Sequence, residues 1–449
     1  MKIKSDSRKI KEGDIFVALK TVNNDGHNYV LDAIEKGAKT VIVEKGLYDV
    51  NTIVVPDTRE FIQEYLKKEY SYLIDELTLI GITGTNGKTT TCYFLYQALN
   101  KLGLKCSYIG TLGFYIGGEK IRDLSNTTPD ILDLYELFLE SYENDCKFVV
   151  MEVSSQALDM KRVQGIKFDY AVFTNLTKDH LDFHQTMENY ALAKQKLFTN
   201  LKPNGKAIVN VDSQYDDYFL LSENNNITYG FSDSYYQITD YEIGKDYTIF
   251  NVQNITYKTK TFGKYNIYNM LVVIIILKDL GFDDKTIQKI VSEIETPSGR
   301  MDIINFGNNK IIIDYAHTPD AVSNIINAVK EMNSDNIYTI IGCGGNRDKS
   351  KRSLMGKIAT NLSTKVIFTS DNPRNEDPLS IINDMVVNLV NSNYEIEINR
   401  KDAIKKGIQM LEKNDILLVL GKGHETYQII GNEKIHFDDK EEVLNIIRR

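Results

Sequence analysis

Cysteine is scarce in this sequence, with 4 residues among 449, and no two of them lie close together along the chain. Disulfide scaffolds and zinc ribbons both need paired cysteines, so the composition excludes these two classes of protein. Few and scattered cysteines are typical of a reducing compartment. The N-terminal stretch MKIKSDSRKIKEGD also lacks the apolar segment of a signal peptide, and we therefore expect a cytoplasmic location.

Long hydrophobic runs are missing as well. The most apolar stretch, MLVVIIIL at 270–277, is too short to span a bilayer and is followed directly by Lys278 and Asp279. We interpret this stretch as a buried helix of a globular domain, and we expect no membrane partner.

Positive charge is also in deficit, because 53 Lys and Arg stand against 62 Asp and Glu, for a formal net charge of −9. A chain of this sign is a poor general binder of nucleic acids or anionic membranes. We expect a monomer that acts on small molecules and binds no nucleic acid. The hydrophobic fraction of 42% can fill several cores, and a chain of 449 residues suggests about three domains.

The hydrophobic pattern predicts an α/β protein of three domains. We expect a small α/β unit at residues 1–76, a larger unit with a mostly parallel sheet at 77–297, and a doubly wound unit at 298–449. The elements expected in the first unit are strands at 15–19 and 40–45 and a helix at 31–38, which Gly37 ends.

The second unit opens with a buried strand at 77–84, a glycine turn and a helix at 89–103. The polar stretch 214–260 lacks a strong period and is expected to hold meandering strands, and residues 297–299 are expected to be a linker. The remaining elements expected here are strands at 148–153, 170–176 and 206–211 and an amphipathic helix at 284–295.

The third unit alternates apolar and amphipathic stretches, which favours a Rossmann-like parallel sheet. In such sheets ligands bind beyond the carboxyl ends of the strands, and polar clusters follow four of the apolar runs directly: His317, Gly344–Arg347, Asp371–Arg374 and Gly421–Glu425. The expected strands are 311–317, 338–345, 365–371 and 415–423, and the expected helices are 319–331, 351–362, 378–390 and 401–412.

The segment GTNGKTT at 84–90 carries the strongest chemical signal in the chain. The backbone amides of such a loop, and the N-terminus of the helix that follows, point at an anion. Lys88 can reach a terminal phosphate, and the Thr89 hydroxyl can hold Mg²⁺. The strict P-loop pattern requires glycine where this chain has Ile82, but the strand before and the helix after favour phosphate binding over an ordinary glycine turn.

Other polar groups of the second unit are less specific. Glu152 ends the run FVVME and is either a solvated loop residue or a carboxylate for the Mg²⁺ of the loop. The segment NLTKDHLDFH at 175–184 holds two of the six histidines and two aspartates, which indicates a metal or phosphate site, although no third soft ligand favours zinc. For Lys194, the residue type alone predicts a surface lysine with its ammonium in water.

Two arginines of the third unit lie on turns after predicted strands. Asn372–Pro373 is a turn signal, and Arg374 directly after it could grip a carboxylate through two hydrogen bonds. Arg347, in GGNRDK, lies on a similar loop. Together the two arginines indicate a small anionic substrate, and pairing to structural carboxylates is the equally weighted alternative for each.

In this order the motifs resemble the Mur ligases, the ATP-dependent amide-forming enzymes of bacterial cell-wall precursor synthesis, and within them the diaminopimelate-adding branch. The resemblance covers nearly the whole chain. It is carried by DSR (6–8) with GDIFVAL, GTNGKTTT, NTTP (126–129), MEVSS, NLTKDHLDFH, AKQKLF, GKYNIYN (263–269), GRM (299–301), DYAHTPD, GCGGNRDKSKR, DNPR and GKGHETYQ.

The resemblance implies an N-terminal UDP-sugar-binding domain, a central ATP-binding domain and a C-terminal Rossmann-like domain that binds an amino acid. It implies an ADP-forming peptide synthetase that adds meso-diaminopimelate to UDP-MurNAc-L-Ala-D-Glu during peptidoglycan synthesis. ATP would phosphorylate the terminal carboxylate of the dipeptide, and the incoming amine would attack the resulting acyl phosphate. The implied cofactors are two Mg²⁺ ions and a CO₂-derived carbamate on Lys194.

The resemblance also assigns roles to residues. Lys88, Glu152, His180 and Lys194 would be catalytic, and Thr89, Glu152, His180 and carbamylated Lys194 would hold the metal ions. ATP would be bound by Gly84, Thr85, Asn86, Gly87, Lys88, Thr89, Thr90, Asn269, Arg300, Asp314 and His317. The UDP-MurNAc-dipeptide would be bound by Ser7, Asn126, Thr127, Thr128, Ser154 and Arg162. Diaminopimelate would be bound by Arg347, Asp371, Asn372, Arg374, Gly421 and Glu425.

Two alternatives remain open at this point. One is a ligase of the same fold that adds L-lysine or another amine, which would not need Arg374 for a distal carboxylate. The other is a non-catalytic nucleotide-binding regulator, which would need the phosphate loop but not Lys194 or the two arginines. Because the phosphate-binding and amine-binding residues lie on different domains, we also expect hinge motion near 296–300.

Overall fold

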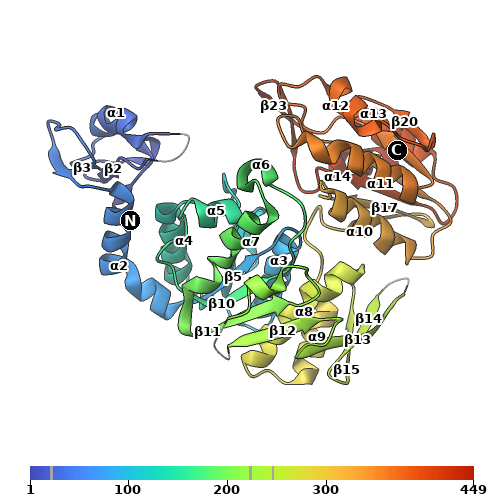
Figure 1. The fold of residues 1–449 in the computed structure, drawn as a ribbon, viewed down its shortest axis with the longest axis horizontal. Helices are drawn as coiled ribbons and strands as arrows, with labels where there is room; N and C mark the ends of the chain where they lie inside the picture. Colours follow the sequence, from blue (N-terminus) through green and yellow to red (C-terminus); the bar gives the residue numbers. More distant parts are fainter. Residues whose placement is uncertain (21–23, 222–224, 245–246, 449) are drawn as a thin grey trace.

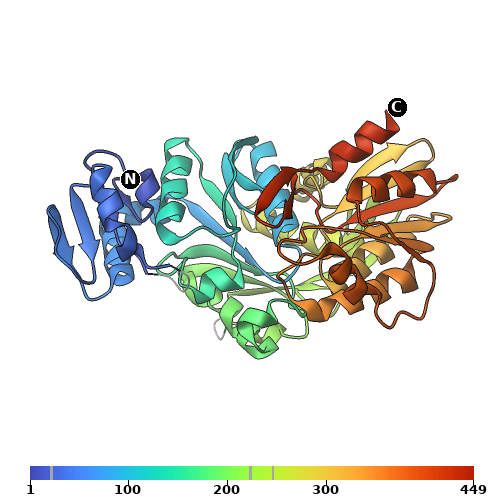
Figure 2. The same cartoon turned by 90° about the horizontal axis from the view of Figure 1, so that it is seen from above.

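A computed structural model describes residues 1–20, 24–221, 225–244 and 247–448. These residues form three units in a row, and the N-terminal and C-terminal units lie at opposite ends in both views (Figures 1 and 2). The described chain contains sheets of 4, 11 and 6 strands and a separate two-stranded hairpin. This arrangement confirms the predicted α/β class.

The N-terminal sheet is parallel throughout, in the order β1-β2-β3-β4. The predicted strands appear as β2 (Ile15–Val17) and β3 (Thr40–Val43), and the predicted helix as α1 (Val30–Glu35). The sequence analysis missed β1 (Ile3–Lys4), which is two residues long, and β4 (Asn51–Val54), which is largely exposed. It also missed α2 (Thr58–Glu76), a long helix that leads from this sheet to the next.

The central sheet has the order β15-β14-β13-β12-β11-β10-β5-β9-β6-β7-β8. Within it β5 (Thr78–Thr83) lies between β10 (Phe168–Phe173) and β9 (Phe148–Glu152), and both run parallel to it. The other strands are β6 (Cys106–Gly110), β7 (Gly113–Ile116), β8 (Glu119–Arg122), β11 (Leu201–Asn210), β12 (Asn226–Gly230), β13 (Tyr236–Ile243), β14 (Thr248–Val252) and β15 (Ile255–Thr259).

Helices cover both faces of the central sheet, and each face has its own hydrophobic core. One core includes α4 (Ile131–Glu143), α5 (Ser155–Asp159) and α7 (Met187–Gln195). The other includes α3 (Lys88–Lys101), α8 (Lys264–Asp279) and α9 (Asp284–Glu293). The apolar run 270–277 lies within α8 and is fully buried, as the sequence predicted.

The polar stretch 214–260 does hold a meander, because β13, β14 and β15 pair antiparallel in sequence. Residues 222–224 and 245–246 of that stretch lie outside the described residues. The antiparallel strands β7 and β8 at the opposite edge were not predicted, and β8 is exposed along its whole length.

The C-terminal sheet has the order β16-β17-β21-β18-β19-β20, and β16 alone pairs antiparallel within it. Its strands are β16 (Asp302–Phe306), β17 (Asn309–Asp314), β18 (Ile337–Ile341), β19 (Lys365–Phe368), β20 (Tyr394–Ile396) and β21 (Ile416–Leu420). One face is covered by α10 (Pro319–Lys330), α11 (Arg352–Leu362) and α12 (Pro378–Val386), and the other by α13 (Arg400–Gln409) and α14 (Asp439–Ile447). Helices on both faces confirm the predicted doubly wound architecture.

Two predicted helix ends of this unit were wrong. The helix predicted over 378–390 ends at Val386, and Asn388 just beyond it has a left-handed φ of 58°, which a continuing helix cannot accommodate. The helix predicted over 401–412 ends at Gln409. The sequence analysis also missed the hairpin of β22 (Tyr427–Ile430) and β23 (Glu433–His436). Within the described ranges, no helix combines the length and the apolar character needed to cross a bilayer.

Candidate active site

The glycine loop connects β5 to α3 at the carboxyl edge of the central sheet. Close packing explains its glycines: a Cβ on Gly84 would collide with Thr174 Oγ1, and a Cβ on Gly87 would lie 2.7 Å from Asn269 Oδ1. Gly87 also has a φ of 87°, which favours glycine. The loop is therefore fixed tightly against β10 and α8, with the N-terminus of α3 open to a ligand.

Two lysines meet at one carbonyl under this loop. Lys88 Nζ donates to Gly84 O and to Thr85 O, both at 2.8 Å, and Lys194 Nζ donates to Gly84 O at 2.7 Å. Lys194 is only 1% exposed, so the interpretation of this residue as a surface lysine is wrong. Burial, together with the charge of Lys88, lowers the pKa of Lys194 well below its usual range. Burial also lowers the pKa of Lys88.

Glu152 is completely buried at the end of β9 and faces the first turn of α3, which excludes the solvated alternative. Its carboxylate accepts hydrogen bonds from Thr89 Oγ1 at 2.8 Å and from Tyr108 Oη at 2.6 Å. Thr111 adds its backbone N–H at 2.8 Å and its hydroxyl at 3.2 Å. A carboxylate and a threonine hydroxyl thus lie side by side at the phosphate loop.

His180 lies at the start of the short helix α6 (Leu181–His184), with a left-handed φ of 54°. Its Nε2 is 3.6 Å from Asp179 Oδ2, and its Nδ1 is 3.5 Å from Gln156 Nε2. Burial and the nearby Lys88 and Lys194 lower the pKa of His180, against the opposing effect of Asp179. The imidazole is therefore neutral near pH 7, in the form that can bind a metal ion.

Residues of the C-terminal unit close the other side of this site. Arg300 Nη2 lies 3.5 Å from Thr89 Oγ1, and its guanidinium carbon lies 4.4 Å from the centre of the Tyr315 ring. Asp314 accepts the backbone N–H of Met301 at 2.7 Å, and burial raises its pKa. Burial lowers the pKa of His317 to about 4.

These central and C-terminal residues share one cavity of about 800 Å³. The predicted nucleotide and metal residues that line it are Thr85, Asn86, Gly87, Lys88, Thr89, Thr90, Glu152, His180, Asn269, Arg300, Asp314 and His317. Gly84 and Lys194 do not line it, but Lys194 Nζ contacts the phosphate loop at Gly84 O. The structure therefore brings together residues that are more than 200 positions apart in the sequence.

The residues predicted for the dipeptide lie next to this cavity, and Thr127 and Ser154 line it. Thr128 Oγ1 donates to Glu152 O at 2.9 Å and accepts from Ser154 N at 3.0 Å, while Arg162 Nη1 donates to Thr128 O at 3.0 Å. Asn126 is exposed nearby in the chain. Ser7 is apart from this group, buried in the N-terminal unit.

The residues predicted for the amine lie at the carboxyl edge of the C-terminal sheet and do not line the same cavity. Arg374 Nη1 donates to Gly345 O at 2.9 Å and to Asn372 O at 3.4 Å. No acidic partner of Arg374 or of the exposed Arg347 is recorded among the described residues. The alternative of pairing to structural carboxylates therefore has no support here, and both guanidinium groups are available to a ligand.

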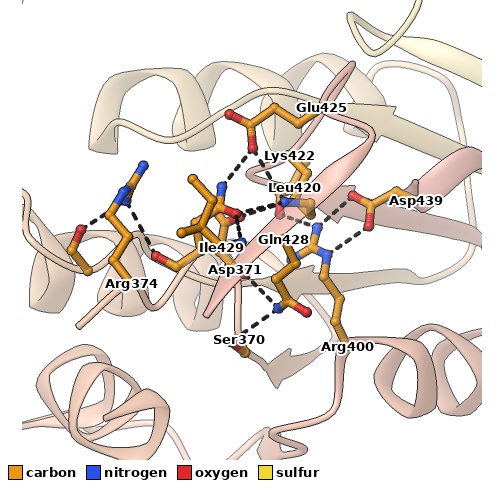
Figure 3. A network of polar contacts seen from close by, with 12 residues as sticks. Ser370, Asp371, Arg374, Arg400, Leu420, Lys422, Glu425, Gln428, Ile429 and Asp439 are labelled. Atoms are coloured by element: carbon orange, nitrogen blue, oxygen red, sulfur yellow. Dashed lines mark hydrogen bonds and ion pairs between the residues drawn. The ribbon is translucent and has the colours of Figure 1, made fainter. Parts of the chain in front are cut away.

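A buried polar network adjoins Arg374 (Figure 3). Asn372 Nδ2 donates to Glu425 Oε2 at 2.7 Å, and Asn372 Oδ1 accepts from Ile429 N at 2.9 Å. Burial and the neighbouring Asp371 raise the pKa of Glu425. Gly421 has a φ of 112°, and a Cβ there would lie 3.1 Å from Asp371 Oδ2, so glycine is needed at this position.

Sequence reasoning missed several residues that the structure places in these sites. Asp179 lies beside His180, Tyr190 Oη is 3.2 Å from Thr85 Oγ1, and Asp320 accepts from Asn86 Nδ2 at 2.8 Å across the two units. Lys422 is buried beside Glu425. Asp179, Asp320 and Lys422 lie inside the motifs NLTKDHLDFH, DYAHTPD and GKGHETYQ, so their position in these motifs could have identified them. Tyr190 lies outside the motifs.

Comparison with known proteins adds a family assignment. The Mur ligase family catalytic domain matches residues 2–70, the Mur ligase middle domain matches 82–277, and the Mur ligase glutamate ligase domain matches 299–423. Proteins of Fusobacterium nucleatum and Clostridium perfringens, both named UDP-N-acetylmuramoyl-L-alanyl-D-glutamate–2,6-diaminopimelate ligase, are 42% and 41% identical to this chain. These alignments cover 98% and 99% of this chain and 92% and 94% of the relatives.

A solved structure of a UDP-N-acetylmuramoyl-L-alanyl-D-glutamate–2,6-diaminopimelate ligase is similar along its whole length. It superimposes with a TM-score of 0.69 at 32% sequence identity, covering 99% of this chain and 94% of that one. The family models match all three units, and the relatives are similar from end to end. This chain belongs to the Mur ligase family.

Proposed function

We propose that this chain is an ATP-dependent, ADP-forming ligase that adds meso-diaminopimelate to UDP-MurNAc-L-Ala-D-Glu in peptidoglycan precursor synthesis. Its three units would be the UDP-sugar-binding domain (1–76), the ATP-binding domain (77–297) and the amino-acid-binding domain (298–449). The relatives of 42% and 41% identity carry the name of this reaction and are similar over the full chain.

The observation that carries the proposal is the charge arrangement at the carboxyl edge of the C-terminal sheet. The guanidinium of Arg374 donates to the backbone carbonyls of Gly345 and Asn372. The carboxylate of Glu425 belongs to the same network, because it accepts a hydrogen bond from the side chain of Asn372 (Figure 3). Diaminopimelate carries a carboxylate and an ammonium at its distal end, and these two groups complement Arg374 and Glu425. Lysine has the distal ammonium but no carboxylate for Arg374.

The phosphate loop fits ATP. The glycines at 84 and 87 leave no room for side chains, the amides at the start of α3 point outward, and Lys88 lies at the floor. The buried Nε of Arg300 has no hydrogen-bond partner among the described residues, although burial of an unpaired donor is costly. A polyphosphate at this position would supply the acceptor, and Asn269, Asp314 and His317 would surround the nucleoside.

The donor set beside the loop fits Mg²⁺. Glu152 and Thr89 offer hard oxygen atoms 2.8 Å apart, and the neutral His180 lines the same cavity. Bound there, Mg²⁺ would neutralise charge on the phosphoryl oxygens.

Lys194 fits a carbamate. A neutral amine is the form that adds CO₂, releasing one proton and leaving an N-carboxylate, and the lowered pKa of the buried Lys194 favours this form. Because both lysines contact Gly84 O, the carboxylate would place a negative group beside Lys88. We propose that this carbamate is the oxygen ligand of a second metal ion.

The residues of these sites would then act by positioning. Thr127, Thr128, Ser154 and Arg162 would hold the dipeptide so that its terminal carboxylate faces the γ-phosphate. Lys88, Arg300 and the loop amides would stabilise charge on the phosphoryl oxygens during transfer. Glu425 and Arg374 would then orient diaminopimelate so that its free amine attacks the acyl phosphate and phosphate leaves.

The experiment is phosphate release from ATP with UDP-MurNAc-L-Ala-D-Glu and Mg²⁺, comparing meso-diaminopimelate with L-lysine. We expect release that depends on diaminopimelate, with the tripeptide product identified by mass. Equal release with lysine would mean that another amine is the substrate. The absence of release with either amine, together with intact nucleotide binding, would support a nucleotide-binding regulator and contradict the ligase.

A further inference from the structure

Lys422 is a buried cation to which the proposed reaction gives no task. It lies in the turn directly after β21 and is 0% exposed. Its Nζ is 3.3 Å from Glu425 Oε2, 3.4 Å from Asp371 Oδ1 and 3.4 Å from Asn372 Oδ1 (Figure 3). One ammonium thus contacts three of the residues predicted to bind diaminopimelate, which we call the amine site.

The three contacts join two separate chain segments. Asp371 and Asn372 follow β19, whereas Glu425 follows β21, with β18 between these strands in the sheet. Asn372 Nδ2 donates to the same Glu425 oxygen that Lys422 approaches, so the amide and the ammonium fix one rotamer of the carboxylate. Lys422 therefore links the segments that follow β19 and β21 at the point where the substrate ammonium would bind.

The charges around Glu425 make this contact necessary. Burial and Asp371 disfavour its ionised form, and Lys422 opposes both effects. The other groups that face Glu425 cannot replace Lys422: Tyr315 and Tyr427 are neutral phenols whose pKa values are raised. Arg400 is committed to Asp439 through two hydrogen bonds of 2.7 Å. Among the described residues, Lys422 is the cation that forms ion pairs with Asp371 and Glu425.

We propose that Lys422 is a positioning residue for the amine substrate: it aligns Asp371, Asn372 and Glu425 and balances the two carboxylates so that Glu425 receives the distal ammonium of diaminopimelate. This inference rests on the proposed function. Lys422 does not need to contact the substrate, because all of its hydrogen-bonding capacity is directed into the protein.

The test is the Lys422→Met variant, which keeps the length of the side chain and removes its charge. We expect the KM for meso-diaminopimelate to rise about tenfold or more, because a buried carboxylate loses its counter-charge, while kcat and the KM for ATP change by less than about threefold. The matched control is Lys434→Met. That exposed lysine lies 3.8 Å from the Tyr427 ring and contacts neither carboxylate, so we expect wild-type constants.

The pH dependence separates charge balance from a purely structural role. In Lys422→Met the pKa of Glu425 rises further, so the KM for diaminopimelate should be raised most at acidic pH and should recover as the pH rises and Glu425 ionises. Lys422→Arg keeps the charge and should retain the wild-type pH profile. Adding Asp371→Asn to Lys422→Met removes the competing carboxylate and should reduce the extra pH dependence.

An unchanged KM for diaminopimelate in Lys422→Met would overturn the inference. Equal losses in kcat and in the KM of every substrate, with the wild-type pH profile, would also overturn it, because they indicate only a structural role. Should Lys422→Met not fold, the double variant with Asp371→Asn, which removes one buried charge of each sign, carries the same pH test. Failure of the proposed function would give a different result, because the wild-type protein itself would then release no phosphate with diaminopimelate.

Discussion

The nucleotide site and the amine site are both built at the carboxyl edges of parallel strands, but they handle charge in opposite ways. Within the described chain, the cations of the nucleotide site, Lys88, Lys194 and Arg300, have carbonyl, hydroxyl or aromatic partners and no acidic one. In the amine site, Lys422 already forms ion pairs with Asp371 and Glu425. Among the described residues, Arg374 and Arg347 of that site form no ion pair with a carboxylate.

This difference follows from the charge that each ligand would bring. ATP would deliver several negative charges, so the cations of its site gain their counter-ions only on binding. Diaminopimelate would bring charges of both signs, and its site must keep one carboxylate ionised and oriented before binding. The first site therefore depends on the ligand for its charge balance, whereas the second is balanced by the protein.

The largest expected effect comes from removing the lysine of the phosphate loop. Lys88→Met should reduce kcat for phosphate release by about a thousandfold, because the charge on the phosphoryl oxygens loses a preorganised donor. Lys101→Met, at the other end of α3 and 3.9 Å from Glu293, is the control and should retain activity. A near-wild-type kcat in Lys88→Met would show that this lysine does not stabilise charge on the phosphoryl oxygens.

A smaller loss is expected at Lys194. Lys194→Ala should lower kcat by about a hundredfold with the fold intact, and small carboxylates such as acetate should restore part of it by replacing the carbamate oxygens. Carbon-13 NMR with labelled CO₂ should show a carbamate signal in the wild type that the variant lacks. Lys196→Ala removes a half-exposed lysine paired with Asp159 and should change neither readout. Full activity of Lys194→Ala would reject the carbamate.

A modest effect on stability is expected at the loop that carries Arg347. Arg352 donates to both carboxylate oxygens of Glu376, at 2.9 and 3.0 Å, and these bonds lower the pKa of Glu376 to about 2. Because the folded pKa lies below the unfolded one, this stabilisation is complete above about pH 5 and is lost as the pH falls toward about 2.

Glu376→Gln should therefore lower Tm at neutral pH and flatten the dependence of Tm on pH between about 5 and 2, as followed by circular dichroism. Glu376 also accepts the backbone N–H of Asn346, which precedes Arg347, so we expect Glu376→Gln to displace Arg347 and to raise the KM for diaminopimelate only about threefold. Glu433→Gln, on the exposed strand β23, is the control. Identical slopes of Tm against pH in Glu376→Gln and wild type would contradict the pKa assignment.

Sequence patterns predicted much of the fold, because buried strands and amphipathic helices have clear periods. The strand–glycine loop–helix unit at 78–101 and the alternating C-terminal elements both appear where the pattern placed them. The missed elements are the ones with weak patterns: β4 and β8 are largely exposed, and α2 has only one face that is partly buried. For such segments the tertiary environment decides, and local sequence carries little information.

The site shows the same division. The glycine loop could be recognised from local chemistry. The structure explains why its glycines cannot be replaced, because a Cβ on Gly84 or Gly87 would collide with neighbouring side chains. Lys194 could not, because its burial and its contact with Gly84 depend on packing between α7 and a loop 110 residues earlier. Lys422 was overlooked for the same reason, since its partners at Asp371 and Asn372 lie about 50 residues away.

The most direct test of the contrast between the two sites is the ratio of kcat/KM for meso-diaminopimelate to that for L-lysine, measured in the wild type and in Arg374→Ala. We predict that the variant loses about a hundredfold in kcat/KM for diaminopimelate and almost nothing for lysine, because Arg374, which forms no ion pair with any described residue, would bind the distal carboxylate that lysine lacks. Arg448→Ala, at the exposed end of α14, should leave the ratio unchanged. Equal losses for both amines in Arg374→Ala would contradict the account.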